Sequence, residues 1–225
     1  MKSDIAMRVA FIVIDMQYDF GDPNGALFVP GGDTVVEPVN TLRSTLEGVG
    51  ALTVFTQDWH PAEHVSFASN NNGAALFSVV NLAGIGDQVM WPNHCVMNTP
   101  GASFLPALHF DAAVDKVIRK GSLRDVDSYS GFGSPGRKRE RTALEDTLRA
   151  AGVTHVVIAG LALDYCVSYT ARDAAELGFR VCVAKFATRG ISFDSIEKEM
   201  ALMKEAGVVV AESAEEVTAF ARGNL

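Results

Sequence analysis

The chain has 225 residues, of which 48% are hydrophobic and 20% are charged. This length and composition are typical of one large globular domain, which can bury a sizeable core without disulfides or structural metals. The net charge of −8, from 19 basic and 27 acidic residues, argues against nucleic-acid binding, because such binding depends on neutralising phosphates with Lys and Arg.

Short apolar runs rich in Val and Ile predict six buried strands. Their hydrophobicity is continuous rather than alternating, which indicates that helices cover both faces of a parallel sheet. In chain order the runs are Val9–Ile14, Leu52–Phe55, Val117–Ile118, Val156–Ala159, Val181–Ala184 and Val208–Ala211.

Helical patterns lie between the predicted strands. Periodic apolar residues predict helices over 36–46, 142–151, 164–177 and 196–206, and a last helix opening at Ser213 with Glu216. Thr142 and Glu145 have the spacing of a capping box. The alternation predicts a three-layer α/β/α fold with a mainly parallel, doubly wound sheet of about six strands.

Two irregular stretches, 59–110 and 121–140, interrupt this alternation. Stretches of this length inside a compact domain usually carry function or small elements of their own. The chain shows no repeat and no linker, so we expect a single domain over residues 1–225. A basic run from Arg137 to Arg141, interrupted by Glu140, is typical of a solvated loop, with a nuclear-import patch as the alternative.

The three cysteines, Cys95, Cys166 and Cys182, are odd in number and lack framework spacing. This pattern indicates a reducing compartment and leaves a free thiol to explain. The apolar run near the N-terminus is too short for a signal peptide, and no stretch reaches membrane-spanning length. We therefore expect a cytoplasmic protein without a membrane partner.

Reactive side chains follow four successive predicted strands. Asp15 ends the first, Asp58 and His60 follow the second, Lys120 ends the third, and the fourth leads into the turn before Cys166. Ligands bind outside the carboxyl ends of the strands in open parallel sheets. We therefore expect these groups to share one site.

Cys166 lies where a strand gives way to a helix that opens near Asp164. A thiol in the first turn of a helix would feel the positive end of the macrodipole, which favours the thiolate nucleophile. Neighbouring backbone N–H groups would then form an oxyanion hole. Position alone leaves open the alternative of a buried small hydrophobic residue, which suits Cys95 and Cys182.

Asp15 closes an apolar strand, where an ionised carboxylate is costly unless it is paired. A cysteine hydrolase needs a base for its thiol proton. Asp15 is the candidate base, and Lys120 would stabilise negative charge beside it. The alternatives are a helix cap or turn role for Asp15 and an ordinary surface position for Lys120.

The segment TQDWHPAEHVSF and the later WPNHC carry a candidate metal site. Asp58 and His60 point to one side of an extended chain. Glu63 and His64 lie close by, and His94 follows later. Two histidines and one carboxylate leave open coordination positions, as in a catalytic site. Polar loop residues that satisfy one another are the alternative.

Several other motifs are missing from the sequence. No dinucleotide-binding glycine motif follows the first strand, and there is no P-loop and no G-x-S-x-G elbow. These absences disfavour nucleotide-binding and serine-hydrolase functions.

A set of segments spans nearly the whole chain: VIDMQYDF, PGG, TQDWHPAEHVSF, WPNHCVMNTPGASF, RKG, DSYSGF, GLALDYCVSYTARDA and ATRG. In this order they resemble the nicotinamidase (pyrazinamidase-like) branch of the isochorismatase-like cysteine hydrolase superfamily. The DWHP and WPxHC segments separate this branch from superfamily members without metal. The resemblance implies the isochorismatase-like hydrolase fold.

The resemblance also implies roles for individual residues. Asp15, Lys120 and Cys166 would form a catalytic triad. The backbone N–H groups of Ala162 and Cys166 would form the oxyanion hole, with a non-proline cis peptide between Leu161 and Ala162.

By the same resemblance, Asp58, His60 and His94 would hold one divalent metal ion, zinc first, with manganese, iron or cobalt as alternatives. Some relatives use the histidine at the place of His64 as a further ligand and others do not. The positions that line the family's slot for a pyridine ring are those of Phe20, Trp91 and Tyr165.

The implied reaction is hydrolysis of nicotinamide to nicotinic acid and ammonia, a step of NAD salvage. Asp15 would deprotonate Cys166, the thiolate would attack the amide carbonyl, and water would hydrolyse the thioester. Lys120 would orient Asp15 and lower the pKa of its carboxyl group, and the metal would position the ring nitrogen and water. The nearer alternative is another small-amide hydrolase of the superfamily, and the further one is a non-catalytic binding protein. The sequence does not determine the oligomeric state, and a homo-oligomer is one alternative.

Overall fold

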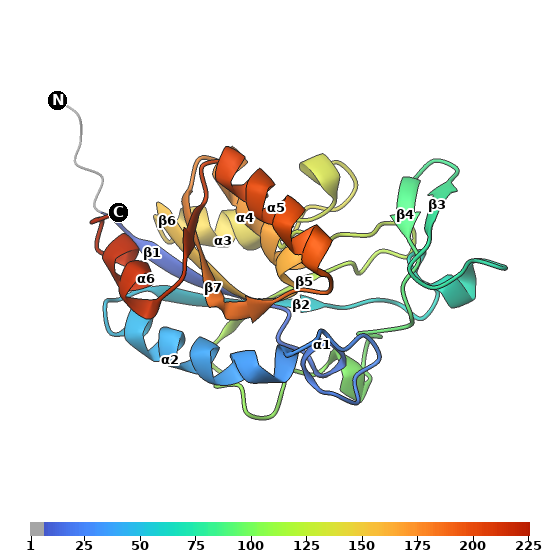
Figure 1. Cartoon of the computed structure of the whole chain (residues 1–225), viewed down its shortest axis with the longest axis horizontal. Coiled ribbons are helices and arrows are strands. Elements are labelled where there is room, and N and C mark those ends of the chain that lie inside the picture. Colours follow the sequence, from blue (N-terminus) through green and yellow to red (C-terminus); the bar gives the residue numbers. More distant parts are fainter. Residues whose placement is uncertain (1–6) are drawn as a thin grey trace.

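A six-stranded sheet forms the centre of the molecule in the computed structural model, which describes residues 7–225 (Figure 1). The strand order is β5-β2-β1-β6-β7-β8, and every pairing in this sheet is parallel. The strands are β1 (Val9–Ile14), β2 (Leu52–Asp58), β5 (Lys116–Lys120), β6 (His155–Leu161), β7 (Arg180–Arg189) and β8 (Val209–Ala211). The predicted α/β fold class is confirmed.

The observed strands lie where the apolar runs predicted them, with some differences in length. β8 begins at Val209, one residue later than predicted, and β7 continues well past Ala184 to Arg189. Between the pairs Ile158–Val183 and Gly160–Thr188, β6 advances by two residues and β7 by five. This bulge lengthens β7, because it lets the strand rejoin the ladder after an interruption.

Helices cover both faces of the sheet, as Figure 1 shows. On one face lie α2 (Val36–Glu47) and α6 (Ala214–Ala221), and on the other lie α3 (Leu144–Ala150), α4 (Ser168–Glu176) and α5 (Phe193–Glu205). A further short helix, α1 (Tyr18–Gly21), follows β1. Among the described residues no helix is long and apolar enough to cross a membrane.

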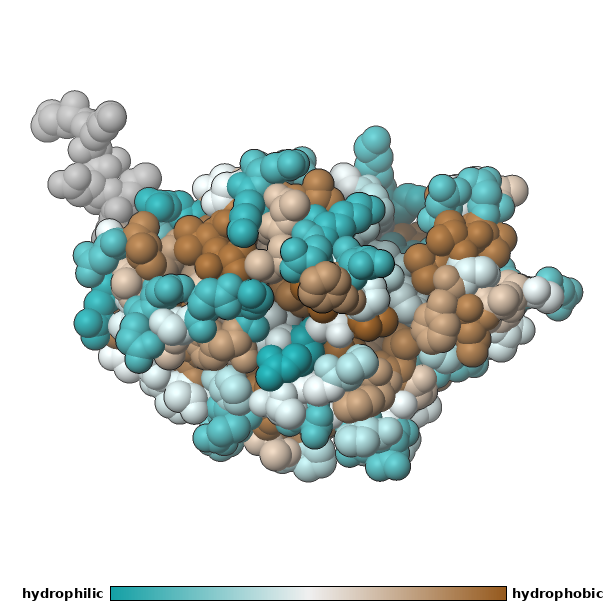
Figure 2. Space-filling model, in the orientation of Figure 1, coloured by the Kyte–Doolittle hydropathy of each residue, from teal (hydrophilic) through white to brown (hydrophobic). Residues whose placement is uncertain are grey.

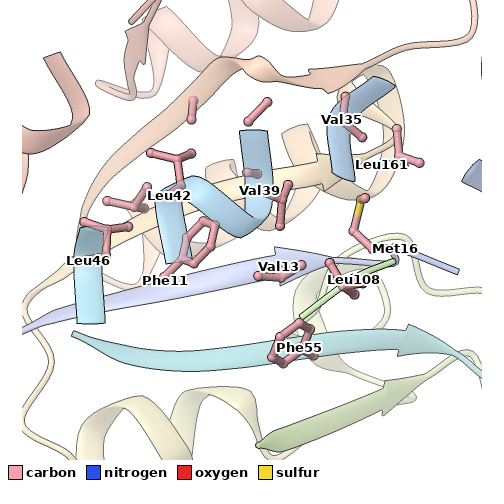
Figure 3. Packing of buried hydrophobic residues seen from close by; sticks show 14 of the residues in the cluster. Phe11, Val13, Met16, Val35, Val39, Leu42, Leu46, Phe55, Leu108 and Leu161 are labelled. Carbon is pink, nitrogen blue, oxygen red and sulfur yellow. The ribbon is translucent and has the colours of Figure 1, made fainter. Parts of the chain in front are cut away.

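The side chains of β1 divide between the two layers. Phe11 and Val13 pack towards α2, against Leu42 and its neighbours (Figure 3), whereas Ile12 and Ile14 belong to the core beneath α3, α4 and α5. All of them are fully buried. This division explains why the strand is apolar throughout: each face of the sheet requires its own hydrophobic side chains.

Two helix starts show how far local patterns predict caps. Ser213 Oγ accepts a hydrogen bond from Glu216 N at 3.3 Å, so the predicted start of α6 is confirmed. The predicted capping box of Thr142 is wrong. Its O–H donates to Gly131 O, and its oxygen accepts from Leu144 N rather than from Glu145 N. Thr142 thus ties the start of α3 to the preceding loop, and the N-cap residue Ala143 forms no side-chain cap.

The two irregular stretches contain small elements, as predicted. The first holds an antiparallel hairpin of β3 (Val79–Leu82) and β4 (Gly86–Val89), which projects from the body of the molecule (Figure 1). Its strands and the preceding turn expose hydrophobic side chains, among them Phe77 and Val79, and Figure 2 shows hydrophobic surface over this part. The second stretch carries a 3-10 turn at Pro135–Arg137.

The sheet changes winding direction between β1 and β6. From β1 the chain builds outward through β2 to β5, and β6 then pairs with the other side of β1 before β7 and β8 follow. Such a switch point opens a crevice at the carboxyl ends of the strands. Asp15 follows β1 there, and Cys166 lies in the turn after β6.

We predict that Ile12→Ala lowers the free energy of unfolding by about 2–5 kcal/mol, because it leaves a cavity beneath α3 and α4. Urea denaturation followed by circular dichroism measures the change. Val79→Ala is the matched control: its side chain is 63% exposed, so the effect should stay within about 0.5 kcal/mol. Equal losses in the two variants would contradict this account of the core.

Candidate active site and metal centre

The ammonium group of Lys120 lies at the centre of the candidate site, fully buried at the end of β5. Its Nζ is 3.0 Å from Asp15 Oδ2 and 3.3 Å from Cys166 Sγ. It also forms an ion pair with Asp58 and donates to the carbonyl of Ser128 at 3.1 Å. The structure therefore brings together the groups that the sequence placed at four strand ends.

Asp15 is oriented by Thr56 on the neighbouring strand, a partner that sequence reasoning missed. Thr56 Oγ1 donates to Asp15 Oδ1 at 2.6 Å and accepts from the Asp15 backbone N–H at 3.2 Å. This leaves Oδ2 for Lys120. An oxygen of the carboxylate also lies within 4.8 Å of the Cys166 sulfur.

The electrostatics of Asp15 differ from the expectation. Burial raises the pKa of the carboxyl group, Lys120 opposes this, and the nearby Asp58 raises it further. Lys120 thus lowers the pKa of Asp15 as predicted, but burial outweighs it and the net shift is upward. Loss of hydration outweighs one favourable charge when the carboxylate is fully buried. The pKa of Lys120 is raised in turn, because Asp15 and Asp58 outweigh its own burial.

Cys166 lies in a π-helical turn, Leu163–Val167, and α4 begins only at Ser168. Cys166 therefore lies in the first turn of a helix that opens next to Asp164, as predicted, although this turn is π-helical. The expected bias towards the thiolate is not observed. Burial raises the pKa of the thiol well above its usual value, although Lys120 opposes this shift. The resting group is a thiol, which needs a base before it can react.

The backbone before Cys166 has the predicted shape. The peptide between Leu161 and Ala162 is cis. The amides of Tyr165 and Val167 both donate to the carbonyl of Ala162 at 3.1 Å. Neither of these amides belongs to the expected oxyanion donors, the N–H groups of Ala162 and Cys166, whose role stays a prediction.

Asp58, His60 and His94 form the candidate metal centre, with ligand atoms within 4.8 Å of one another. Nδ1 of His60 and Nδ1 of His94 each lie 2.8 Å from a backbone carbonyl, those of Gly121 and Pro92. A carbonyl only accepts, so each Nδ1 carries a proton, and the neutral form of each ring offers its Nε2 lone pair.

This donor set fits a first-row divalent cation. Two imidazole nitrogens and one carboxylate leave positions open for other ligands, as catalytic centres do. Burial and the neighbouring His60 lower the pKa of His94 to about 4, so its ring is neutral at pH 7. Loss of hydration likewise lowers the pKa of His60, but Asp58 outweighs it and the net shift is upward.

His64 is committed to other partners. Its Nδ1 is 2.8 Å from Ser66 Oγ, its Nε2 is 3.0 Å from the carbonyl of Val126, and its ring stacks on that of His60 with centroids 4.2 Å apart. Both ring nitrogens have partners. These hydrogen bonds compete with metal ligation by His64, although one ligand atom each of His64, His60 and Asp127 also lie within 4.8 Å of one another.

A narrow pocket joins the metal centre to the expected aromatic slot. Phe20, Trp91 and Tyr165, the three residues predicted to hold a ring, line it together with the three candidate metal ligands and Ala162. Trp91 meets Tyr165 edge-on with centroids 5.0 Å apart. Aromatic side chains and the polar candidate ligands therefore line the same pocket.

Sequence reasoning missed several residues that shape this pocket. Gln17 holds Asp58 by accepting from its N–H and donating to its carbonyl, both at 2.8 Å. Asp19 accepts from the N–H of Cys95, beside His94, at 2.7 Å. Asp127 lines the pocket. All of these residues lie inside the segments that resemble the family, and this location was the one feature of the sequence that could have identified them.

A thiol at the switch point of a parallel sheet, beside a buried carboxylate and ammonium, is the arrangement of a cysteine-dependent α/β hydrolase. The isochorismatase domain pattern matches residues 9–215, and the chain belongs to this family. The predicted resemblance is thereby confirmed.

Individual relatives narrow the comparison. Over 195 residues the chain is 40% identical to the nicotinamidase of Escherichia coli, and the aligned region covers 87% of this chain and 89% of the relative. A solved Acinetobacter nicotinamidase–pyrazinamidase superposes with a TM-score of 0.85 at 35% identity, covering 94% of this chain and 98% of that one. The structure of the pyrazinamidase of Pyrococcus horikoshii in complex with zinc superposes with a TM-score of 0.76 at 36% identity, and the match covers 92% of this chain and 99% of that one.

We predict that Lys120→Met slows alkylation of Cys166 by iodoacetamide and moves its pH profile to higher pH. The ammonium lowers the pKa of the thiol, so removing it raises that pKa, and the thiolate is the reactive form. Mass spectrometry of the Cys166 peptide across a pH series gives the rates. Lys185→Met, which removes a more exposed lysine paired with Glu212, should leave the profile unchanged.

Proposed function

We propose that this protein is a nicotinamidase, an amidohydrolase that converts nicotinamide to nicotinic acid and ammonia. The observation that carries the proposal is one pocket in which the aromatic walls, the candidate metal ligands and Ala162 meet beside the buried thiol. The identity to curated nicotinamidases over most of the chain supports the substrate. The family match over residues 9–215 supports a single domain.

The first half of the reaction uses Asp15 and Cys166. Asp15 Oδ2 takes the thiol proton, and its raised pKa makes it a stronger base than a hydrated carboxylate. Lys120, 3.3 Å from the sulfur, stabilises the thiolate. The sulfur bonds to the amide carbon, and the oxyanion accepts hydrogen bonds from the N–H groups of Ala162 and Cys166. The C–N bond then breaks, and the proton held by Asp15 leaves with ammonia.

The second half releases the acid. Asp15, again ionised, takes a proton from water as the water oxygen bonds to the thioester carbon. The C–S bond breaks, nicotinic acid forms, and the proton on Asp15 returns to the sulfur. One carboxylate thus serves both halves as base and acid.

Asp58, His60 and His94 would hold one divalent cation, and the zinc complex of the Pyrococcus relative supports zinc. When bound, this ion supplies a Lewis acid for the ring nitrogen of the substrate and for water. Phe20, Trp91 and Tyr165 would enclose the ring. The function requires a small amide and no nucleic-acid or membrane partner, and we propose a cytoplasmic enzyme.

We predict that Cys166→Ala abolishes ammonia release from nicotinamide while the fold is retained, because a methyl group replaces a thiol in a packed turn. Cys182→Ala, which removes a buried thiol on β7, should retain turnover. A coupled ammonia assay and thermal melting of both variants test this. Turnover that survives in Cys166→Ala would rule out the thioester route.

We predict that chelation removes most activity and that added Zn²⁺ restores it. His60→Ala and His94→Ala should each lower both zinc content and turnover, because each deletes one of three ligands. His64→Ala should lower them less, because both of its nitrogens have other partners. Elemental analysis measures the zinc content of each variant, and the ammonia assay measures its turnover. Full activity at zero metal content would contradict the metal site.

A further inference from the structure

We infer that Glu140 is a positioning residue that holds His60 in place for metal binding through the backbone of Gly121. Glu140 is the acidic residue that interrupts the basic run, a feature that the reaction does not use. The inference rests on the proposed metal site, since His60 is one of its three ligands.

The carboxylate of Glu140 accepts hydrogen bonds from the loop that follows Lys120. Oε2 accepts from the Gly121 N–H at 3.0 Å, and Oε1 accepts from the N–H and the hydroxyl of Ser122, each at 3.2 Å. Glu140 is only 8% exposed. Hydrogen bonds to an ionised carboxylate are stronger than neutral ones, so these contacts hold the turn firmly.

Gly121 in turn determines where the ring of His60 lies. Its carbonyl is 2.8 Å from His60 Nδ1, which leaves Nε2 to face the metal centre. Its φ of +61° is left-handed, and a Cβ built there would overlap Cε1 of His60 and lie 2.7 Å from its Nδ1. The imidazole therefore packs directly on the glycine, and a shift of this turn would displace the ligand.

Glu140 is itself held by the preceding loop. Its N–H donates to Ser134 Oγ and its carbonyl accepts from Ser134 N, both at 3.0 Å. The neighbouring Arg137 and Arg141 pair with acids on α4 and α3. The charge of Glu140 is thus committed to the turn after β5, which explains an acidic residue at this place in a basic run.

The test measures the affinity for Zn²⁺ alone, by competition with a chromophoric chelator, in the full-length protein. Outer partners of ligating histidines typically contribute about 10–100-fold to metal affinity, so we expect Glu140→Ala to raise the Kd by that factor. Glu140→Gln should recover part of the loss, because its amide oxygen still accepts from Gly121. Glu145→Ala is the matched control, since Glu145 pairs only with Arg141 and Arg149 among the described residues, and its Kd should not change.

A spectroscopic readout separates positioning from general destabilisation. The visible absorption of bound Co²⁺ reports ligand geometry, and we expect it to change in Glu140→Ala and to return towards wild type in Glu140→Gln. Melting of each metal-free variant measures stability. The inference is overturned if Glu140→Ala keeps wild-type affinity and spectrum, or if affinity falls only in step with metal-free stability. A wild-type protein that binds no Zn²⁺ would overturn the metal site as well, so the two failures are distinguishable.

Discussion

The buried ammonium of Lys120 is the interaction on which the site depends. A fully buried charge is costly unless opposite charges and hydrogen bonds replace its hydration. Asp15, Asp58 and the carbonyl of Ser128 provide these. Because the two carboxylates follow β1 and end β2 while the lysine ends β5, the ion cluster also joins three adjacent strands at their carboxyl ends.

Asp58 links the two halves of the site. It neutralises Lys120 on one side and faces His60 on the other, with His60 Nε2 3.5 Å from its Oδ2. The charge at the nucleophile and the charge at the metal centre are therefore coupled through one carboxylate. Replacing Asp58 would disturb both at once, so variants at His60 or His94 isolate the metal centre more cleanly.

Backbone anchoring recurs around this charged centre. Gln17 bonds both backbone groups of Asp58, Asp19 bonds the amide after His94, and Glu140 bonds the turn that supports His60. Each anchor is a buried polar side chain acting on main chain rather than on a ligand atom. Loops as long as those that carry the histidines need such fixed points to present ligands with little freedom.

The sequence by itself determined the succession of strands and helices along the chain and which residues follow each strand. Continuous apolar runs such as Val9–Ile14 predict buried strands of a parallel sheet, and the groups at their carboxyl ends, Asp15 and Lys120 among them, are then expected to meet at one sheet edge. Family motifs added the grouping of Asp58, His60 and His94. These are local patterns, readable without knowledge of distant contacts.

Only the tertiary structure decided how these groups behave. The raised pKa values of Asp15 and Cys166 come from exclusion of solvent by segments far away in sequence. Hydrogen bonds between separate segments likewise form only in the folded chain. They join His64 to Val126, Thr142 to Gly131, and Glu140 to Gly121. Burial and hydrogen-bond partners are properties of the assembled fold, and a periodic pattern carries no information about which loop will close over a given side chain.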